Sequence, residues 1–273
     1  MRLLFLSFLM TSLLFISCGG DDADNTTEEE TSSTTQETDM AKGYSLYAFE
    51  ESTAYPDATI DDMIYADGTF EFPITATNYL LGAQTPDADS KMCANSGKGQ
   101  HIHLIVDNAP YAAKYENKFS HEVTDGEHHI LAFLSRSYHE SIKTDAAHTA
   151  QKVTVAGGSF TATEDIKDPM LFYSRPKGTY VGKKNTEKVM LDFYVVNLNL
   201  GEDYQVKVEI NGEFEQMIDV WQPYYLEGLP MGDNKVKLTL IDGAGNTVDT
   251  PLNPVERVFT LKEDPAESSM GMQ

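Results

Sequence analysis

Two histidines on alternate residues, His101 and His103, are the side chains with the clearest potential for chemistry in this chain. They lie in the segment Gly99-Gln-His-Ile-His-Leu-Ile-Val-Asp107, whose alternation of character is typical of a β-strand. A strand sends residues i and i+2 to the same face, roughly 6.5 to 7 Å apart. We therefore expect both imidazoles on one face, where they can lean towards one ligand, and a core on the other face, contacted by Ile102, Leu104 and Val106.

All seven histidines lie between positions 101 and 148. Neutral imidazole is the commonest protein ligand for zinc and copper, and three or four converging rings make a site. The sequence predicts such a site from His101, His103, His139 and one of His128 and His129. Met92 and Cys93 could add sulfur ligands that suit cuprous ion. The alternative is that these histidines and the aromatic residues near them pack against a second domain or bond to carboxylates.

Part of this pattern resembles a known family. The run from Gly99 to Asp107 is similar to the Gly-His-His-His-Leu-Leu-Ile-Asp signature of an uncharacterised domain of secreted bacterial proteins, with Ile102 in place of the middle histidine. Gly126-Glu-His128 and Tyr138-His139 resemble that domain's later turn and loop. The resemblance covers only the first half of the chain, and it implies a histidine site without implying a reaction.

A competing motif is Ser135-Arg-Ser-Tyr-His139. It resembles the ligand-binding loop of forkhead-associated domains, which are β-sandwiches that bind phosphothreonine. The resemblance implies a phosphopeptide- or protein-binding module that uses Ser135, Arg136, Ser137 and Tyr138, since arginine makes bidentate contacts to phosphate. The alternative is a polar loop whose Arg136 pairs with a nearby acid.

No enzyme signature is present: the chain has no Gly-x-Ser-x-Gly elbow, phosphate loop or His-Glu-x-x-His motif. We therefore expect a binding protein rather than an enzyme. The segment Trp221-Gln-Pro-Tyr-Tyr225 could form a sugar-stacking platform, although in a sandwich such a segment is more often a core tryptophan and a corner.

An internal repeat organises the rest of the chain. Residues 70–78 match 189–197, 101–107 match 205–211, and 119–155 match 225–261 without a gap. Each copy is about 100 residues of short alternating strands separated by turns, which is typical of a sandwich. The fold class we predict is all-β, with two tandem immunoglobulin-like antiparallel β-sandwich domains at 43–156 and 169–263, a linker at 157–168 and a disordered tail at 264–273.

The two copies differ on the outward face of their strands. The second copy has Gln205, Lys207 and Glu209 where the first has His101, His103 and Ile105. The first copy also carries a longer connection, 79–100, before its histidine strand. Because long insertions and unusually apolar faces tend to serve function, something other than water is expected to cover the outward face of the first copy.

The N-terminus resembles a bacterial lipoprotein signal. Residues 1–17 are an apolar run too short to span a bilayer, followed by Cys18, the residue that would be acylated. An acidic tether, 18–42, has almost nothing to bury and should stay flexible. We expect a lipid anchor in the bacterial outer membrane, with the protein facing the cell exterior. The net charge of −23 argues against nucleic acid as a partner.

Overall fold

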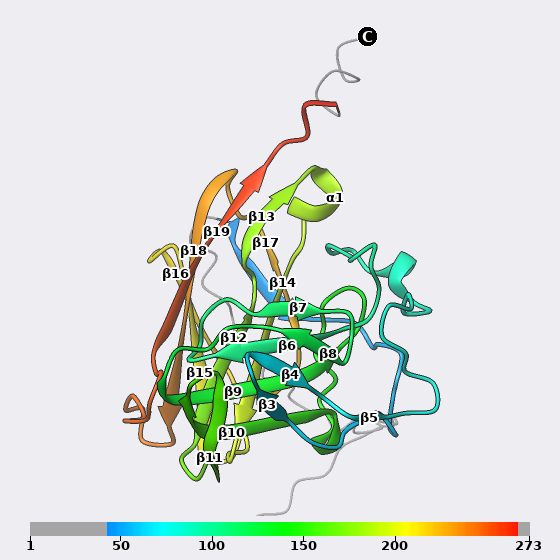
Figure 1. Ribbon diagram of the computed structural model, residues 1–273. Helices are drawn as coiled ribbons and strands as arrows, with labels where there is room; N and C mark the ends of the chain where they lie inside the picture. The colour runs from blue at the N-terminus through cyan, green and yellow to red at the C-terminus, as the bar shows by residue number, and fades with distance from the viewer. Residues whose placement is uncertain (1–42, 267–273) are drawn as a thin grey trace, which may run out of the picture. The chain divides into compact units, whose positions relative to one another are not determined.

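The computed structural model describes residues 43–266, and within them the chain is nearly all β (Figure 1). Its strands form two immunoglobulin-like β-sandwiches, which confirms the predicted fold class. The predicted signal, Cys18, the tether 18–42 and most of the predicted tail lie outside the described residues. No helix in the described part of the chain is both long enough and apolar enough to cross a membrane.

The first sandwich pairs a five-stranded sheet with smaller sheets. The five-stranded sheet has the order β11-β10-β9-β6-β7, and the smaller ones are β3-β4-β8 and β2-β5. The bounds are β2 Thr59–Ile60, β3 Ile64–Ala66, β4 Thr69–Glu71, β5 Ile74–Thr75, β6 His101–Val106, β7 Ala112–Lys114, β8 Lys118–Ser120, β9 Gly126–Ser135, β10 His148–Ala156 and β11 Ser159–Asp165, with short 3-10 helices η2 Ala88–Ser90 and η3 Asp145–Ala147.

The second sandwich pairs a five-stranded sheet, β13-β19-β18-β15-β16, with a four-stranded sheet, β1-β17-β14-β12. The bounds are β1 Ser45–Ala48, β12 Met170–Arg175, β13 Gly178–Val181, β14 Val189–Val196, β15 Tyr204–Ile210, β16 Phe214–Ile218, β17 Tyr224–Glu227, β18 Gly232–Asp242 and β19 Val255–Lys262, with the short helix α1 Lys183–Thr186.

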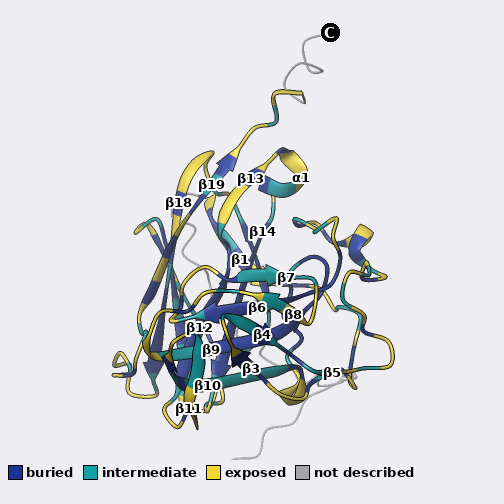
Figure 2. Ribbon diagram, in the orientation of Figure 1, coloured by how far each residue is buried: buried dark blue, intermediate teal, exposed yellow. Residues whose placement is uncertain are grey.

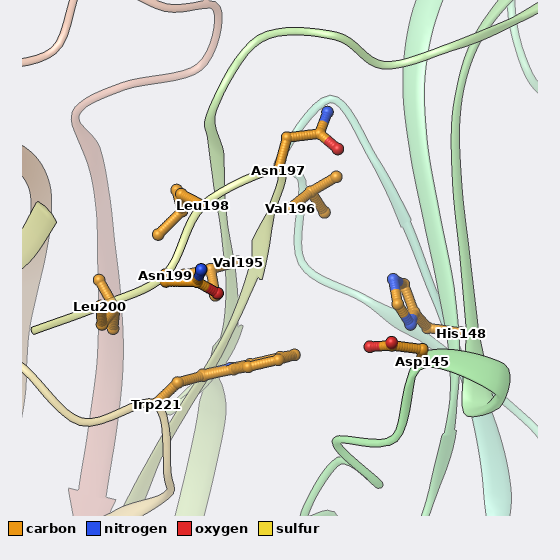
Figure 3. A pocket seen from close by; sticks show the side chains of 9 residues that line it. All are labelled: Asp145, His148, Val195, Val196, Asn197, Leu198, Asn199, Leu200 and Trp221. Atoms are coloured by element: carbon orange, nitrogen blue, oxygen red, sulfur yellow. The ribbon is translucent and has the colours of Figure 1, made fainter. Parts of the chain in front are cut away.

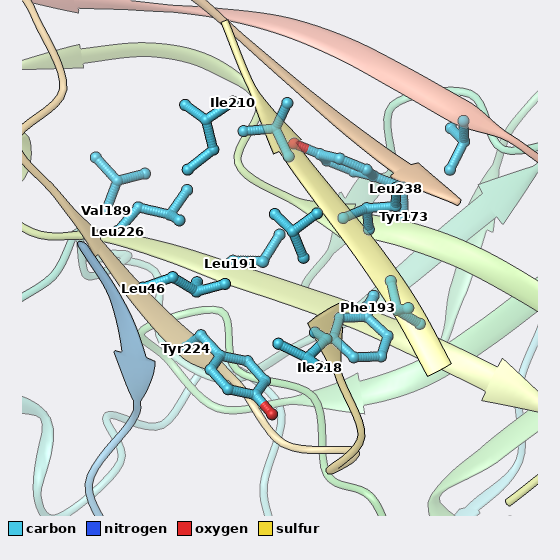
Figure 4. Close-up of a cluster of buried hydrophobic side chains, with 14 of the residues drawn as sticks. Leu46, Tyr173, Val189, Leu191, Phe193, Ile210, Ile218, Tyr224, Leu226 and Leu238 are labelled. Carbon is cyan, nitrogen blue, oxygen red and sulfur yellow. The ribbon is translucent and has the colours of Figure 1, made fainter. Parts of the chain in front are cut away.

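The alternation of apolar residues along the sequence decides which side chains of each strand face the core. Ile102 and Leu104 of β6 join the core of the first sandwich, with Val106 packed at its edge, as predicted. In the second sandwich, Leu191 and Phe193 pack against Ile210 and Leu238 from the opposite sheet (Figure 4). Cross-sheet burial of this kind is the main stabilising term of a sandwich.

The repeat is visible in the turns. Asp107 and Asn211 follow equivalent strands, and both adopt positive φ. Asp107 Oδ1 accepts a hydrogen bond from the backbone N–H of His129, and Asn211 Oδ1 accepts one from that of Lys235. A short polar side chain is favoured at such left-handed positions, so both copies keep one there.

The structure differs from the predicted boundaries in two places. The segment 157–168 is not a plain linker, because most of it forms β11, which pairs with β10 and places Phe160 against the first core. At the other end, β1 lies within the predicted first domain, 43–156, but pairs with β17 of the second sandwich. The described chain therefore contributes its first strand, β1, to the second sandwich, then forms the first sandwich, and then completes the second.

The outward face of the first sandwich is covered by protein. Strands β12 and β14 are buried along almost their whole length (Figure 2), because their sheet has two apolar faces. One face lies in the core of the second sandwich, and the other packs Met170, Phe172 and Tyr194 against Leu131 and Phe133 of β9. The expectation that something other than water covers this face is confirmed, and the cover is the second sandwich, as the alternative interpretation held.

The equivalent face of the second copy is solvated, as predicted. Lys237 and Lys207 lie near Glu209, with N···O distances of 3.0 and 3.6 Å. Pairs of opposite charges on the surface keep that face solvated. The two copies therefore differ in structure on the same face on which their sequences differ.

Candidate functional site

Three histidines converge at the edge of the covered face. His101 Nε2 lies 2.8 Å from His103 Nε2 and 3.0 Å from His139 Nδ1. The three nitrogens lie within 4.8 Å of one another, and they form the only group of three or more candidate metal ligands found among residues 43–266. Here we call His101, His103 and His139 the histidine cluster.

Two local structures place these side chains. His101 and His103 occupy alternate positions of β6, so both project to the same side. His139 comes from the tight loop after β9, where it adopts φ +70° and its N–H donates to the Arg136 carbonyl at 2.9 Å. The left-handed turn brings a residue 38 positions away in sequence next to β6.

The insertion 79–100 positions the first ligand. Gly99, with φ +84°, lies so close to the neighbouring backbone that a Cβ would sit 2.3 Å from the Gly82 carbonyl oxygen. Only glycine fits such an approach without a shift of the backbone. The Gly99 carbonyl lies 2.8 Å from His101 Nδ1 and thereby fixes the ring.

The hydrogen bonds define which nitrogen of His101 is free. A carbonyl oxygen only accepts, so Nδ1 of His101 donates its proton to Gly99 and Nε2 of the neutral ring holds a bare lone pair. Nitrogens of His103 and His139 both lie within hydrogen-bonding distance of that lone pair. The Nδ1 of His103 is 3.2 Å from the Ser174 hydroxyl, which can accept its proton and leave Nε2 of His103 free as well.

Aromatic rings enclose the cluster. Tyr111 stacks on His103 with ring centroids 3.6 Å apart and an interplanar angle of 9°, and Tyr115 lies 5.0 Å from His101. His101 and His103 are fully buried, whereas His139 is half-buried and forms the side nearest to solvent.

Burial keeps the cluster neutral. Loss of solvation lowers the pKa of His101 to about 4 and holds the pKa values of His103 and His139 well below the ordinary 6.5. Neutral imidazole is the form that binds a metal ion, so protons compete weakly for these nitrogens at neutral pH.

Two cations lie near the cluster and add to the lowering of these pKa values. The guanidinium of Arg175 is buried and bonds to the Tyr180 hydroxyl at 2.8 Å, while its Nη1 has no hydrogen-bond partner within the described chain. Lys177 Nζ lies 3.9 Å from the centre of the Tyr111 ring. Burial, and then the proximity of Arg175, lowers the pKa of Lys177 to about 8.

The structure does not bring the other predicted ligands to the cluster. His128 Nδ1 is 2.6 Å from Asp107 Oδ2, at the opposite end of β9, and His129 follows it there. This contact and a backbone bond raise the pKa of His128 against the effect of partial burial. Cys93 is buried in a separate apolar cluster with Phe49 and Tyr138, and Met92 is exposed.

The loop 135–139 uses its polar groups within the protein. The Arg136 guanidinium is buried and donates from Nε and Nη2 to the Thr53 carbonyl at 2.9 and 2.7 Å. Ser135 bonds to the backbone of its own loop, Ser137 exchanges hydrogen bonds with Thr85, and the Tyr138 hydroxyl donates to Asp87. The loop therefore presents His139 to the cluster and does not present Arg136 to an external ligand.

Sequence reasoning missed the residues that enclose the cluster from elsewhere, among them Tyr111, Ser174 and Arg175. One signal could have suggested that the strand that carries Ser174 and Arg175, and the strand paired with it, are buried on both faces and cover the cluster. The runs Met170-Leu-Phe-Tyr173 and Val189 to Val196 are almost continuously apolar, which is typical of strands buried on both faces.

Comparisons with known proteins add little to this picture. No protein-family model matches the chain, and no curated protein sequence matches it. Among solved structures, fibronectin(III)-like modules of Clostridium thermocellum CbhA are 14% identical over 34% of this chain and 98% of theirs, with a TM-score of 0.28. The FN1–FN3 domains of chicken CNTN1 are 11% identical over 76% of this chain and 68% of theirs, with a TM-score of 0.21. SGBP-B of a Bacteroides ovatus mixed-linkage glucan utilization locus, solved in complex with a mixed-linkage heptasaccharide, is 9% identical over 81% of this chain and 70% of its own, with a TM-score of 0.20.

Proposed function

We propose that this protein is a lipid-anchored surface protein that binds one transition metal ion, copper or zinc, through His101, His103 and His139. The observation that carries the proposal is the convergence of three imidazole nitrogens on one point. Binding, not catalysis, is the role we assign.

Protons can satisfy these contacts pair by pair, since the Tyr111 hydroxyl lies 3.3 Å from His139 Nδ1 and the Ser174 hydroxyl 3.2 Å from His103 Nδ1. The single lone pair of His101 Nε2 can accept one well-directed N–H, yet two ring nitrogens lie 2.8 and 3.0 Å from it. One cation held by three lone pairs satisfies all three rings at once. The donors on the far sides of His101 and His103, which bond to Gly99 and Ser174, match the outer hydrogen bonds that orient metal-bound histidines.

One ion can bind all three nitrogens only if their separations change. Zinc binds histidine nitrogen at roughly 2.0–2.1 Å, and tetrahedral angles at that length separate two ligand nitrogens by about 3.3 Å. The pairs at 2.8 and 3.0 Å would have to open by a few tenths of an ångström. The third pair, His103 and His139, sets the 4.8 Å limit of the cluster and would have to close by roughly 1.5 Å. His139 lies on a loop at the open side, so it is the ring best able to move.

The charges nearby shape the affinity. Three neutral imidazoles supply no negative charge, and Arg175 and Lys177 raise the local positive potential. Both effects weaken the binding of a bare divalent ion. They favour the monovalent cuprous ion, or a zinc ion that carries an anion at its fourth position.

The test is a metal titration of the chain from Gly19 onwards. The protein is stripped with a chelator, and Zn²⁺ and Cu⁺ are titrated separately by competition with a chromogenic chelator. We expect one ion per chain, and at least a tenfold loss of affinity in His103→Gln and His139→Gln because each removes one of three ligands.

His129→Gln is the matched control, since it removes a histidine of the same sheet that lies outside the cluster. It should bind as the wild type does. Failure of the wild type to bind either ion, or equal affinities in all three variants, would overturn the metal proposal.

The anchor has a separate test. A Cys18→Ser variant lacks the thiol that a lipoprotein signal acylates. We expect it to leave the membrane fraction and to lose incorporation of labelled fatty acid, whereas Cys93→Ser should retain both. Retention of label by Cys18→Ser would contradict the anchor.

A further inference from the structure

A second candidate site lies away from the histidine cluster. A cavity of about 610 Å³ is bounded by the end of β14 and the loop after it, by Trp221, and by Asp145 and His148 (Figure 3). None of the three clustered histidines lines it. Its volume falls within the range of roughly 300–1,000 Å³ that is usual for small-molecule sites.

Trp221 provides a fixed flat wall. Its indole Nε1 donates to the Phe193 carbonyl at 3.1 Å, and its ring meets Tyr194 edge-on with centroids 4.8 Å apart. Figure 3 shows the ring nearly edge-on, with Asn199 on one side of its plane and Asp145 beyond its end. The hydrogen bond from Nε1 fixes the ring, which is only half-buried, so part of its apolar surface stays accessible to a ligand.

Polar groups without partners surround this wall. Asn199 and Asp145 are exposed, and within residues 43–266 no hydrogen bond to either side chain is found. The Nδ1 of His148 is buried and makes no hydrogen bond of good geometry among the same residues, although backbone groups of Thr144 and Asp145 lie near the ring. A buried polar atom left unpaired is costly, so a ligand that bonds to His148 would gain from it.

The charge of the lining selects against anions. The described residues that line the cavity include one carboxylate, Asp145, and no lysine or arginine. Burial lowers the pKa of His148, so its ring is neutral at pH 7. Lys143 lies 5.2 Å from the Trp221 ring, but it is paired with Asp192 at 2.7 Å and does not line the cavity.

We propose that this cavity binds a neutral carbohydrate, with one sugar ring stacked on Trp221 and its hydroxyls bonded to Asn199, Asp145 and His148. A pyranose ring combines a face of C–H groups with a rim of hydroxyls that donate and accept. That combination matches a flat aromatic wall ringed by unpaired amide, carboxylate and imidazole groups. A purely apolar ligand would leave those polar groups unsatisfied, and a phosphate or uronate would meet Asp145 with no countercharge.

The chain offers a direct probe, because Trp221 is its single tryptophan. Its emission, excited selectively, is recorded while neutral oligosaccharides are added one at a time to the chelator-treated chain: cello-, xylo-, manno- and maltotetraose. We expect at least one of them to shift the emission saturably, with one site per chain by calorimetry. A tetragalacturonate should bind at least tenfold more weakly than that oligosaccharide.

Asn199→Ala and Asp145→Ala should each weaken that binding at least fivefold, and both residues are exposed enough for the fold to survive their loss. Asn78→Ala, an exposed asparagine outside the cavity, should bind as the wild type does. The proposal fails if no neutral oligosaccharide gives a signal, if the acidic one binds best, or if the two cavity variants bind like Asn78→Ala.

Discussion

Neighbouring groups keep the His101 ring neutral, with a free lone pair on Nε2. The Gly99 carbonyl takes its one proton, and full burial removes the water that would stabilise a positive charge. His103 depends in the same way on Ser174 and on the stacked ring of Tyr111. His101 is thus prepared as a lone-pair donor by a carbonyl two residues away, and His103 by a hydroxyl 71 residues away in the sequence.

This preparation predicts a pH-dependent stability of the metal-free protein. The pKa of an unfolded histidine is near 6.5 and that of folded His101 is about 4, so between these values the unfolded state binds more protons. Stability is therefore complete above about pH 6.5 and falls as the pH drops towards 4. The loss between pH 7 and pH 5 should be about 2 kcal/mol for His101, and the lowered pKa values of His103 and His139 add to it in the same direction.

Urea unfolding in the presence of a chelator, at pH 7 and at pH 5, measures this loss. His103→Gln should lose less stability than the wild type over the same interval, because one of the titrating groups is absent. An unchanged difference in that variant would show that the cluster does not titrate as a buried neutral group.

At the scale of elements, the last turn of the insertion 79–100 positions His101 through Gly99. Gly99→Ala would place a methyl group 2.3 Å from the Gly82 carbonyl oxygen at φ +84°. We expect it to cost at least about 2 kcal/mol of stability, because both the close contact and the left-handed backbone oppose a side chain. Metal affinity should fall with it, since the Gly99 carbonyl orients His101.

Gly97→Ala is the matched control for this effect. Gly97 lies two residues away, with ordinary φ and open space where the Cβ would be. Its unfolding free energy and metal affinity should stay near those of the wild type. Equal losses in both variants would mean that the turn does not set the position of His101.

The turn after β6 ties the two sandwiches together. Asn108 accepts from the backbone N–H of Tyr173 and donates to the carbonyl of Leu171, both at 2.8 Å, so its amide pairs with β12 as a neighbouring strand would. Asn108→Ala leaves two buried backbone groups unpaired. We expect a loss of about 2 kcal/mol or more in urea unfolding, against less than about 0.5 for the exposed Asn78→Ala.

At the scale of the whole described chain, the two sandwiches share a core. Leu131 and Phe133 of the first lie in one apolar cluster with Met170, Phe172 and Tyr194 of the second. Asp192 of β14 reaches the first sandwich, where it accepts from Ser141 and pairs with Lys143. Neither sandwich buries this face without the other.

We therefore predict one cooperative unfolding transition. Far-UV circular dichroism reports all the strands, whereas Trp221 emission reports the junction, because this residue packs at the edge of both apolar clusters. The two signals should have coincident midpoints in urea. Two separated transitions, with the emission changing in only one, would show that the sandwiches fold independently.

The sequence by itself determined the sandwich class, the repeat, the inward face of β6, and the placement of His101 and His103 on one side. Side chains alternate between the two faces of a strand, and this alternation can be read from a short stretch of sequence. Only the tertiary structure decided that His139 joins them while His128 does not, that β1 belongs to the second sandwich, and that β12 and β14 cover the histidine face. Those outcomes depend on backbone turns and on pairings between strands distant in sequence, which no local pattern specifies.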